Sequence, residues 1–199
     1  MRRVARDLGV SPMALYWHVA SKEDLLRLMV DAVEGEIEIP QPSGDWRADL
    51  TATAHGYRET LLRHGWMTSL IGHRRSLGPN ELPHIENSLA ALDHLGVTIR
   101  QAFNVLMAVE TYYLGFAIRE QQELAAERAN TRLRPAQVRK AIMGEAARLR
   151  AEDLYPHVAE LFEEGQFLTR DERFDFGLAR LLDGIQADLQ AGVASKVEP

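Results

Sequence analysis

Residues 10–26 read Val-Ser-Pro-Met-Ala-Leu-Tyr-Trp-His-Val-Ala-Ser-Lys-Glu-Asp-Leu-Leu, and this stretch decides the fold of the N-terminal part. Ser11 is a favoured N-cap residue, and Pro12 suits the first helical position, where no N–H is needed. Ser21, followed three residues later by Asp24, has the pattern of a capping box. The stretch therefore predicts a short helix, a tight break and the start of a longer helix.

The segment before this stretch has the spacing of a helix-turn-helix. Residues 2–8 predict an amphipathic helix that carries Val4 and Leu8 on its apolar side and leaves its arginines free to reach outward. Gly9 permits a left-handed turn between two steeply crossing helices, and the small Ala5 lets those helices approach closely.

Three large side chains, Tyr16, Trp17 and His18, follow one another in the short helix. Consecutive helical residues point in different directions, so these three cannot all face one core. At least one of them is expected to point outward, which favours a binding role for this segment.

The residues Leu15–Val19 and Ser21–Leu26 together resemble the signature of the TetR family of bacterial repressors. Five later segments resemble the tetracycline-repressor-like subclass of C-terminal domains: Asp45–Arg47, Tyr57–His64, Gly78–Asn80, Ile85–Leu92 and Tyr113–Gly115. This resemblance implies a transcriptional repressor that a small molecule releases from DNA. The alternative is a homologue that binds a ligand or a partner repressor but not DNA.

The pattern of caps and apolar spacings predicts an all-α protein, since no strand-like alternation of useful length occurs. The connecting helix is expected over Lys22–Glu38, and the loop Pro40–Gly44 is the best domain boundary. We therefore expect a helix-turn-helix head with its connecting helix over residues 1–38, and a helical ligand-binding and dimerisation domain over residues 45–192. Further helices are expected to begin at Asp45, near Trp66, after Pro79, at Thr98, after Pro135, at Tyr155 and at Thr169.

Composition supports a DNA-binding head on an acidic body. The net charge is −6 over 199 residues, yet the first 30 residues hold five Lys and Arg against three Asp and Glu. That segment thus carries +2 and the rest −8, which suits a protein that presents one end to phosphate groups. Without cysteine, signal peptide or an apolar run near 18 residues, the chain is expected to be cytoplasmic and to use no membrane.

The sequence gives no sign of an enzyme. The seven histidines show no metal-binding spacing, and nucleophile-elbow, phosphate-loop and dinucleotide motifs are absent. We expect neither catalysis nor a cofactor.

The resemblance implies that the second short helix enters the major groove of a near-palindromic operator. Arg2 matches a base-contacting arginine, which can pair with a guanine edge through two hydrogen bonds. Met13 and Ala14 match positions that vary in the family and set sequence preference, and their apolar groups would favour a thymine methyl.

The same resemblance implies contacts to the DNA backbone. Tyr16 and His18 match positions that face phosphates or the groove, and Lys22 matches a phosphate contact. Trp17 would contact the backbone or pack within the head. The complete set of expected DNA-binding residues is Arg2, Arg3, Ser11, Met13, Ala14, Tyr16, Trp17, His18 and Lys22.

Heads of this family begin with a helix that precedes the position where this chain starts. Met1 occupies what looks like an internal position of the motif, so we expect that first helix to be missing. The apolar faces of Val4, Leu8, Leu15 and Leu25 would then be partly uncovered. We expect this chain to bind DNA weakly or not at all, and a form extended by upstream in-frame codons to bind it more tightly.

The body is expected to form a homodimer through residues 98–126 and 171–189. Residues 178, 181, 182 and 185 form an apolar stripe, which either joins two subunits or belongs to the chain's own core. The resemblance also implies a pocket for a small, largely apolar effector, although each candidate could equally be a core residue. The candidate lining residues are His64, Met67, Leu70, Asn87, Phe103, Met107, Tyr112 and Phe116.

His64 and Asn87 match positions that hold the drug in tetracycline repressors. The magnesium-binding histidine of that group, however, falls in register near Gly72, with His73 only adjacent, and its glutamate position holds Arg119 beside Glu120. A slip of one residue turns a helical side chain by about 100°. We therefore expect no metal, and an effector other than a tetracycline–magnesium complex.

Overall fold

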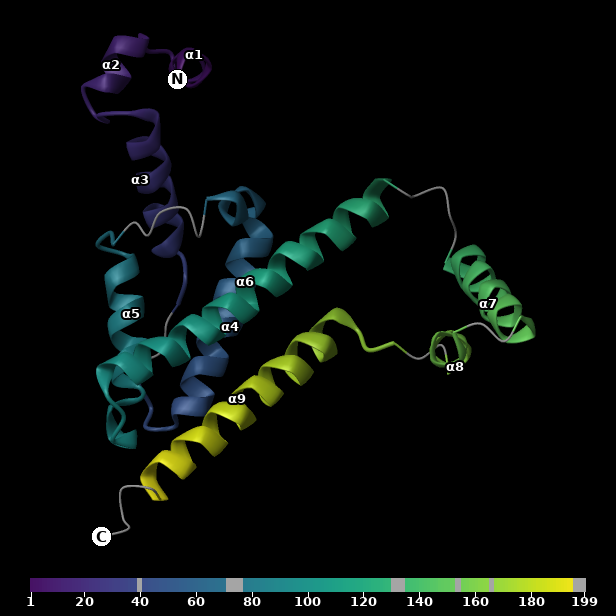
Figure 1. Ribbon diagram of the computed structural model, residues 1–199. Coiled ribbons are helices and arrows are strands. Elements are labelled where there is room, and N and C mark those ends of the chain that lie inside the picture. The colour runs from purple at the N-terminus through teal and green to yellow at the C-terminus, as the bar shows by residue number, and fades with distance from the viewer. Residues whose placement is uncertain (39–40, 71–76, 130–134, 153–154, 165–166, 195–199) are drawn as a thin grey trace. The chain divides into compact units, whose positions relative to one another are not determined.

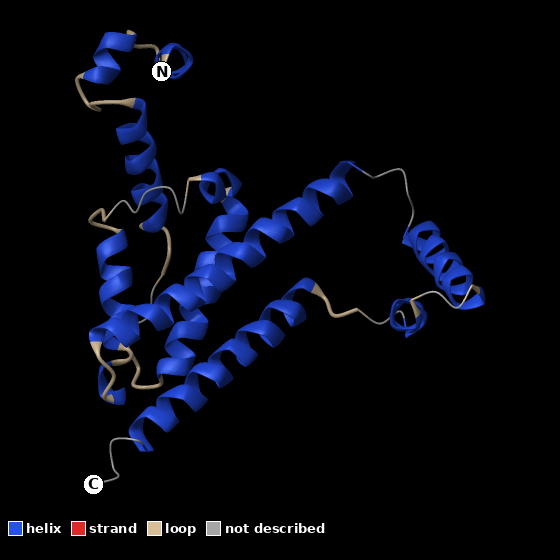
Figure 2. Ribbon diagram, in the orientation of Figure 1, coloured by secondary structure: helices blue, strands red, loops and turns tan. Residues whose placement is uncertain are grey.

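The computed structural model describes residues 1–38, 41–70, 77–129, 135–152, 155–164 and 167–194. Over these residues the regular structure is helical and contains no strand, so the all-α prediction is confirmed (Figure 2). The chain divides into two compact units. One comprises Met1–Arg119 with Leu178–Pro199, and the other comprises Glu120–Gly177.

The head consists of α1 (Arg2–Asp7), α2 (Pro12–Tyr16) and α3 (Lys22–Glu34), and α3 runs from the two short helices toward the body of its unit (Figure 1). The predicted caps are present. The Ser11 hydroxyl accepts the N–H of Ala14 at 3.1 Å, and the Ser21 hydroxyl accepts the N–H of Asp24 at 3.0 Å. The Asp24 carboxylate reaches back to the N–H of Ala20 at 3.2 Å. Gly9 has φ +70°, the left-handed conformation expected between α1 and α2.

The predicted end of the connecting helix at Glu38 is wrong, because α3 ends at Glu34 with Gly35 as its C-cap. The next two amides make shorter-range bonds, from Glu36 to the Val33 carbonyl and from Ile37 to the Glu34 carbonyl. Ile37 is buried, and its side chain lies close to Gly56 of the next helix. Burial of Ile37 against Gly56 thus accompanies the turn that ends the helix.

The body of the first unit is built around α4 (Trp46–Arg63), which Asp45 caps by accepting the amides of Arg47 and Ala48. The 3₁₀ helix η1 (Gly65–Ser69) follows, and α5 (Glu81–Ala90) is followed by η2 (Asp93–Leu95) instead of one helix continuing to Gly96. Both α6 (Ile99–Ala129) and α9 (Arg170–Ala194) divide at the boundary between the units. The fully buried side chains of this unit include Leu50, Leu61, Met67, Leu92, Leu178 and Leu182.

The stripe on α9 packs inside the chain at two of its four positions. Leu178 and Leu182 are 2% and 1% exposed, which makes them core residues of the first unit. Arg47 fixes the start of α4 on the same helix by donating to the Asp183 carboxylate at 2.6 Å and to the Ala179 carbonyl at 3.1 Å.

The second unit contains α7 (Pro135–Ala151), α8 (Pro156–Glu164), the end of α6 and the start of α9. Ala146, Leu149 and Ala159 are buried where α7 packs against α8. The Arg150 guanidinium donates two hydrogen bonds to Glu163, at 2.7 and 2.6 Å. The predicted box at the start of α9 is confirmed, since Glu172 accepts the N–H of Thr169 at 2.8 Å.

Candidate DNA-binding surface and effector site

The structure places the aromatic run of the head on its surface. Trp17 is 85% exposed, Met13 is 70% exposed and Tyr16 is 47% exposed, and His18 is exposed as well. The prediction that at least one residue of this run points outward is confirmed. Val19, at 7% exposure, takes the buried position after α2 instead.

The basic residues of the head are also available at the surface. Arg2, Arg3 and Lys22 are exposed, and Arg3 makes a long ion pair with Asp7 at 3.8 Å, which is worth little between exposed groups. Ser11 is exposed but its hydroxyl serves as a helix cap. Ala14 is half-buried and is therefore less accessible than the exposed Met13.

One face of α1 is apolar and open. Val4 is 39% exposed and Leu8 is 64% exposed, whereas Leu15 and Leu25 are half-buried. Ala5, fully buried, marks the side on which α1 packs within the head. This matches the expectation that these apolar side chains are partly uncovered.

His64, the first of the effector candidates, lies at the C-terminal end of α4. Its Nε2 is 2.8 Å from the Glu36 carboxylate, just beyond the end of α3. Its ring meets Trp66 edge to face, with the centroids 6.3 Å apart. His64 therefore contacts the segment that joins the head to the body.

Two further candidates gather on α6. The rings of Tyr112 and Phe116 lie 6.1 Å apart on successive turns, and the Arg58 guanidinium stands 5.4 Å over the Phe116 ring. Arg58 is only 6% exposed, and sequence reasoning missed it. This aromatic and cationic group combines apolar surface with a buried charge, as ligand pockets often do.

The remaining candidates differ in their surroundings. Met67 is fully buried, Leu70, Asn87 and Met107 are half-buried, and Phe103 is 40% exposed. Phe103 stands roughly 20 Å along the α6 axis from Phe116, at the rise of an α-helix. The two residues therefore mark opposite ends of the predicted set on α6.

A buried polar cluster between α3 and α5 also escaped the sequence analysis. The Asp31 carboxylate of α3 accepts the N–H of Asn80 at 3.1 Å, its side-chain amide at 3.1 Å and the N–H of Glu81 at 3.4 Å. Asp31 thereby caps α5 from another helix, since Asn80 itself makes no capping bond with its side chain. A Cβ on Gly78 would lie 1.9 Å from Asp31 Oδ1, so the fit requires a glycine there.

Glu34, one turn further along α3, is surrounded by α4 and α5. The Tyr57 hydroxyl donates to its carboxyl group, and His84 Nε2 lies 2.9 Å from its backbone carbonyl. Burial raises the pKa of Glu34 to about 7, with the Tyr57 hydrogen bond opposing that shift. Burial also lowers the pKa of His84 and raises that of Tyr57, whose ring stacks on Tyr113 at 4.8 Å.

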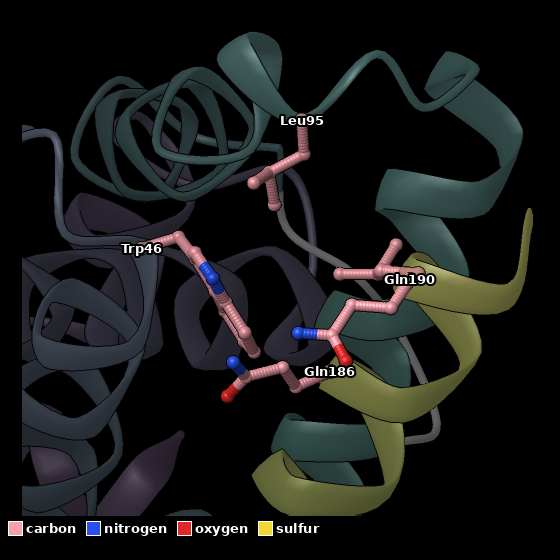
Figure 3. A pocket seen from close by; sticks show the side chains of 5 residues that line it. Trp46, Leu95, Gln186 and Gln190 are labelled. Atoms are coloured by element: carbon pink, nitrogen blue, oxygen red, sulfur yellow. The ribbon is translucent and has the colours of Figure 1, made fainter. Parts of the chain in front are cut away.

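A cavity of about 280 Å³ lies between the start of α4 and the C-terminal part of α9 (Figure 3). Its lining residues are Trp46, Leu95, Gln186, Leu189 and Gln190. None of the eight predicted effector residues lines it.

Gly72 and His73 lie outside the described residues, whereas Arg119 is exposed and Glu120 is buried. Among the residues that the structure describes, no group of three or more His, Cys, Asp and Glu side chains is placed to hold a metal ion. Nor does any described helix combine the length and apolarity needed to cross a membrane.

Comparisons with known proteins agree on one family. Residues 39–189 match the family of tetracycline-repressor-like C-terminal domains. The HTH-type transcriptional repressor DrrR1 of Streptomyces coeruleorubidus is 36% identical over 191 residues, which cover 94% of this chain and 69% of that protein. The class A tetracycline repressor of transposon 1721 from Escherichia coli is 28% identical, covering 92% of this chain and 79% of the relative.

A solved structure gives the same result. The TetR family protein ActR of Streptomyces coelicolor, in complex with actinorhodin, matches with a TM-score of 0.75 and 26% identity, over 95% of this chain and 87% of that one. DrrR1 and the class A protein are both repressors. The chain therefore belongs to the TetR family of transcriptional repressors, with a tetracycline-repressor-like C-terminal domain.

Proposed function

We propose that this ligand-responsive repressor binds a near-palindromic DNA operator through its head, residues 1–38, and responds to an effector through residues 45–192. The observation that supports the DNA-binding surface is the exposure of Tyr16, Trp17 and His18 in and after α2. Large aromatic side chains are rarely left in water without a partner. The proposed DNA-binding residues are Arg2, Arg3, Ser11, Met13, Ala14, Tyr16, Trp17, His18 and Lys22.

We further propose a homodimer through residues 98–126 and 171–189. Exposed apolar side chains on both helices support it: Ile99 is 68% exposed on α6 and Phe176 is 54% exposed on α9. Half-buried Leu181 and Ile185 remain available from the stripe on α9, whereas Leu178 and Leu182 do not. A two-fold dimer would set its two heads about 34 Å apart, one helical turn of DNA.

For the effector we propose a small, largely apolar molecule. The 280 Å³ cavity lined by Trp46 lies just below the usual range of ligand pockets, which begins near 300 Å³. The group formed by Arg58, Tyr112 and Phe116 is the better candidate, because it joins aromatic faces to a buried cation. The similar protein ActR was solved in complex with actinorhodin, which supports an organic effector for this chain too. Of the residues expected from the sequence, Tyr112 and Phe116 form the centre of the proposed site. His64, Met67, Leu70, Asn87 and Met107 remain candidates, and Phe103 is placed outside this site.

The DNA-binding proposal is tested by selecting duplexes from a randomised DNA library with the purified protein. We expect an inverted repeat whose half-sites are about one helical turn apart. Fluorescence anisotropy against salt concentration then compares Lys22→Ala with Lys140→Ala, an exposed lysine of α7. Lys22→Ala should weaken binding and reduce the salt slope by about one per protomer, whereas Lys140→Ala should leave both unchanged. Equal effects of the two substitutions contradict the proposal, and so does enrichment of no duplex by both this chain and the form extended by upstream in-frame codons.

The effector proposal is tested by thermal shift with a panel of hydrophobic aromatic compounds that includes actinorhodin. For a compound that raises Tm, Phe116→Ala should abolish the increase, and Phe103→Ala, at the other end of the candidate set on α6, should preserve it. The compound should also release the selected duplex. An increase that survives Phe116→Ala would place the site elsewhere.

The alternative, a homologue that binds a ligand or partner without binding DNA, is not favoured, since the similarity to a named repressor covers 94% of the chain. The duplex selection distinguishes the two, because a homologue of that kind would enrich no sequence.

A further inference from the structure

Four residues hold the C-terminal end of α3 against α4 and α5. We name them the α3 latch: Asp31, Glu34, Tyr57 and His84. Asp31 caps α5, the His84 ring donates to the Glu34 carbonyl, and the Tyr57 hydroxyl donates to the Glu34 carboxyl. All four are at most 9% exposed. The latch thus joins the helix that carries the head to the body of the same unit through buried hydrogen bonds.

We propose that Glu34 holds a proton in the closed latch, and that loss of this proton releases the end of α3 from α4 and α5. The proposal requires neither DNA nor an effector, so its failure would leave the proposed repressor function intact.

The hydrogen bonding of Glu34 favours its neutral form. The residue is 5% exposed, and its Oε2 has no hydrogen-bond partner among the described residues. The Tyr57 hydroxyl therefore serves the other oxygen. An ionised carboxylate in this position would keep a buried, unpartnered oxygen that carries negative charge, which is costly. A neutral carboxyl group avoids the buried charge.

The groups that face Glu34 from the neighbouring helices also favour its neutral form. The charged groups that act on it are acidic: Asp31 on its own helix, Glu81 on α5 and Glu110 on α6. Each of them opposes a negative charge on Glu34. Tyr57 of α4 faces the same cluster, and burial raises the pKa of its hydroxyl group. Its ring stacks on Tyr113 of α6.

His84 is the titratable group of α5 that contacts the Glu34 backbone. A carbonyl oxygen can only accept, so the bond to the Glu34 carbonyl requires a proton on Nε2. Nδ1 is buried without a partner, and desolvation lowers the pKa of the ring. A second proton on Nδ1 would create a buried cation with no acceptor. His84 is consequently neutral and does not balance a charge on Glu34.

These surroundings raise the pKa of Glu34 from 4.5 to about 7, chiefly through burial. Once the latch opens, exposure to water restores the ordinary pKa of Glu34. The closed state thus binds the proton more tightly, and the ratio of open to closed molecules increases about tenfold for each pH unit between the two pKa values. The whole change amounts to roughly two orders of magnitude and levels off above pH 7, where both states have lost the proton.

The test is amide hydrogen exchange of the full chain between pH 5 and 8.5, without DNA or ligand, divided at each pH by the intrinsic exchange rate. The amides of Asn80 and Glu81 report on the latch, because both donate to Asp31. We expect their protection to fall by roughly two orders of magnitude as pH rises to 7, and then to stay level. Glu34→Gln, a neutral side chain of the same shape, should remove this dependence. Glu23→Gln, at an exposed position of the same helix, should preserve it.

A second variant keeps the proposal testable if Glu34→Gln alters the fold. Tyr57→Phe keeps the aromatic ring that stacks on Tyr113 but removes the hydroxyl that favours the ionised carboxylate. The pH at which protection levels off should therefore move upward. Protection that is independent of pH in the unsubstituted chain overturns the proposal. So does a pH dependence that Glu34→Gln leaves unchanged, or a midpoint that Tyr57→Phe moves downward.

Discussion

Gly78 is the position at which one methyl group should do most damage to the body of this repressor. A Cβ built there lies 1.9 Å from Oδ1 and 2.3 Å from Cγ of Asp31, a separation that no pair of heavy atoms tolerates without a covalent bond. Gly78→Ala must therefore push the Asp31 carboxylate away from the start of α5. The amides of Asn80 and Glu81 would lose their acceptor as a result.

The size of the effect follows from what Asp31 does. Loss of a helix cap costs about 1 kcal/mol, and leaving buried donors or a buried carboxylate without partners costs about 1–3 kcal/mol more. We expect Gly78→Ala to lower the free energy of unfolding by about 2–4 kcal/mol, which corresponds to roughly 5–15 °C in Tm for a chain of this size. Gly144→Ala is the control, since a Cβ on this helical glycine of α7 meets no atom within 4 Å. It should stabilise the protein by about 0.5–1 kcal/mol.

Urea unfolding followed by circular dichroism, at one protein concentration, measures these differences. Asp31→Ala should cost about as much as Gly78→Ala, and the double variant should cost little more than either, because both changes remove the same contact. If Gly78→Ala is as stable as the unsubstituted protein, the described fit between the glycine and Asp31 is incorrect. If the two losses add, Gly78 acts through some other group.

Three further outcomes are expected. Arg47→Ala should lower the free energy of unfolding by about 1 kcal/mol, because it removes the hydrogen bonds that tie α4 to Asp183 and its neighbours on α9. Glu172→Gln should weaken the cap of α9 at pH 7, because hydrogen bonds from Thr169 lower the pKa of Glu172 below its ordinary value of 4.5. The stabilisation is therefore fully present above pH 4.5 and is lost as pH falls through the lowered pKa. Urea unfolding at pH 7 and at a series of lower pH values should show the difference between the two proteins shrinking as pH falls. Trp17→Phe should remove the larger part of the tryptophan fluorescence that iodide quenches, because Trp17 is 85% exposed. In the unsubstituted protein, a specific duplex should protect Trp17 from quenching by iodide.

The beginnings of the helices could be predicted from the sequence because a helix cap is a local structure. Ser11, Ser21, Asp45, Thr98 and Thr169 each accept or donate within a few residues, and the structure contains all five caps. The exposure of the aromatic run was predictable for a similar reason, since three consecutive large side chains cannot share one face of a short helix.

The end of α3 and the latch were not predictable in this way. Asp31 and Glu34 find their partners about fifty residues later in the sequence, in Asn80 and His84. In an amphipathic helix, acidic residues beside an apolar one ordinarily mark the solvated edge. Their only local signal is that they stand three residues apart, on one side of α3, with Val33 between them in sequence. Nothing within the helix indicates which distant donors cover them.

The chemistry of that contact also explains how α3 can transmit a change. In an apolar contact between α3 and the body, the loss of any single atom pair would cost only about 0.1–0.2 kcal/mol. A buried carboxylate that caps α5 is different, since a partly broken set of hydrogen bonds leaves buried polar atoms unpaired. On the proposed release of the latch, the end of α3 would pass from the fully bonded arrangement to one in which water bonds its polar groups, with a costly region between the two. A connection of this kind would convert a small structural change in the body into one of two positions of the head. A repressor needs such a conversion if an effector bound to the body is to release the head from DNA.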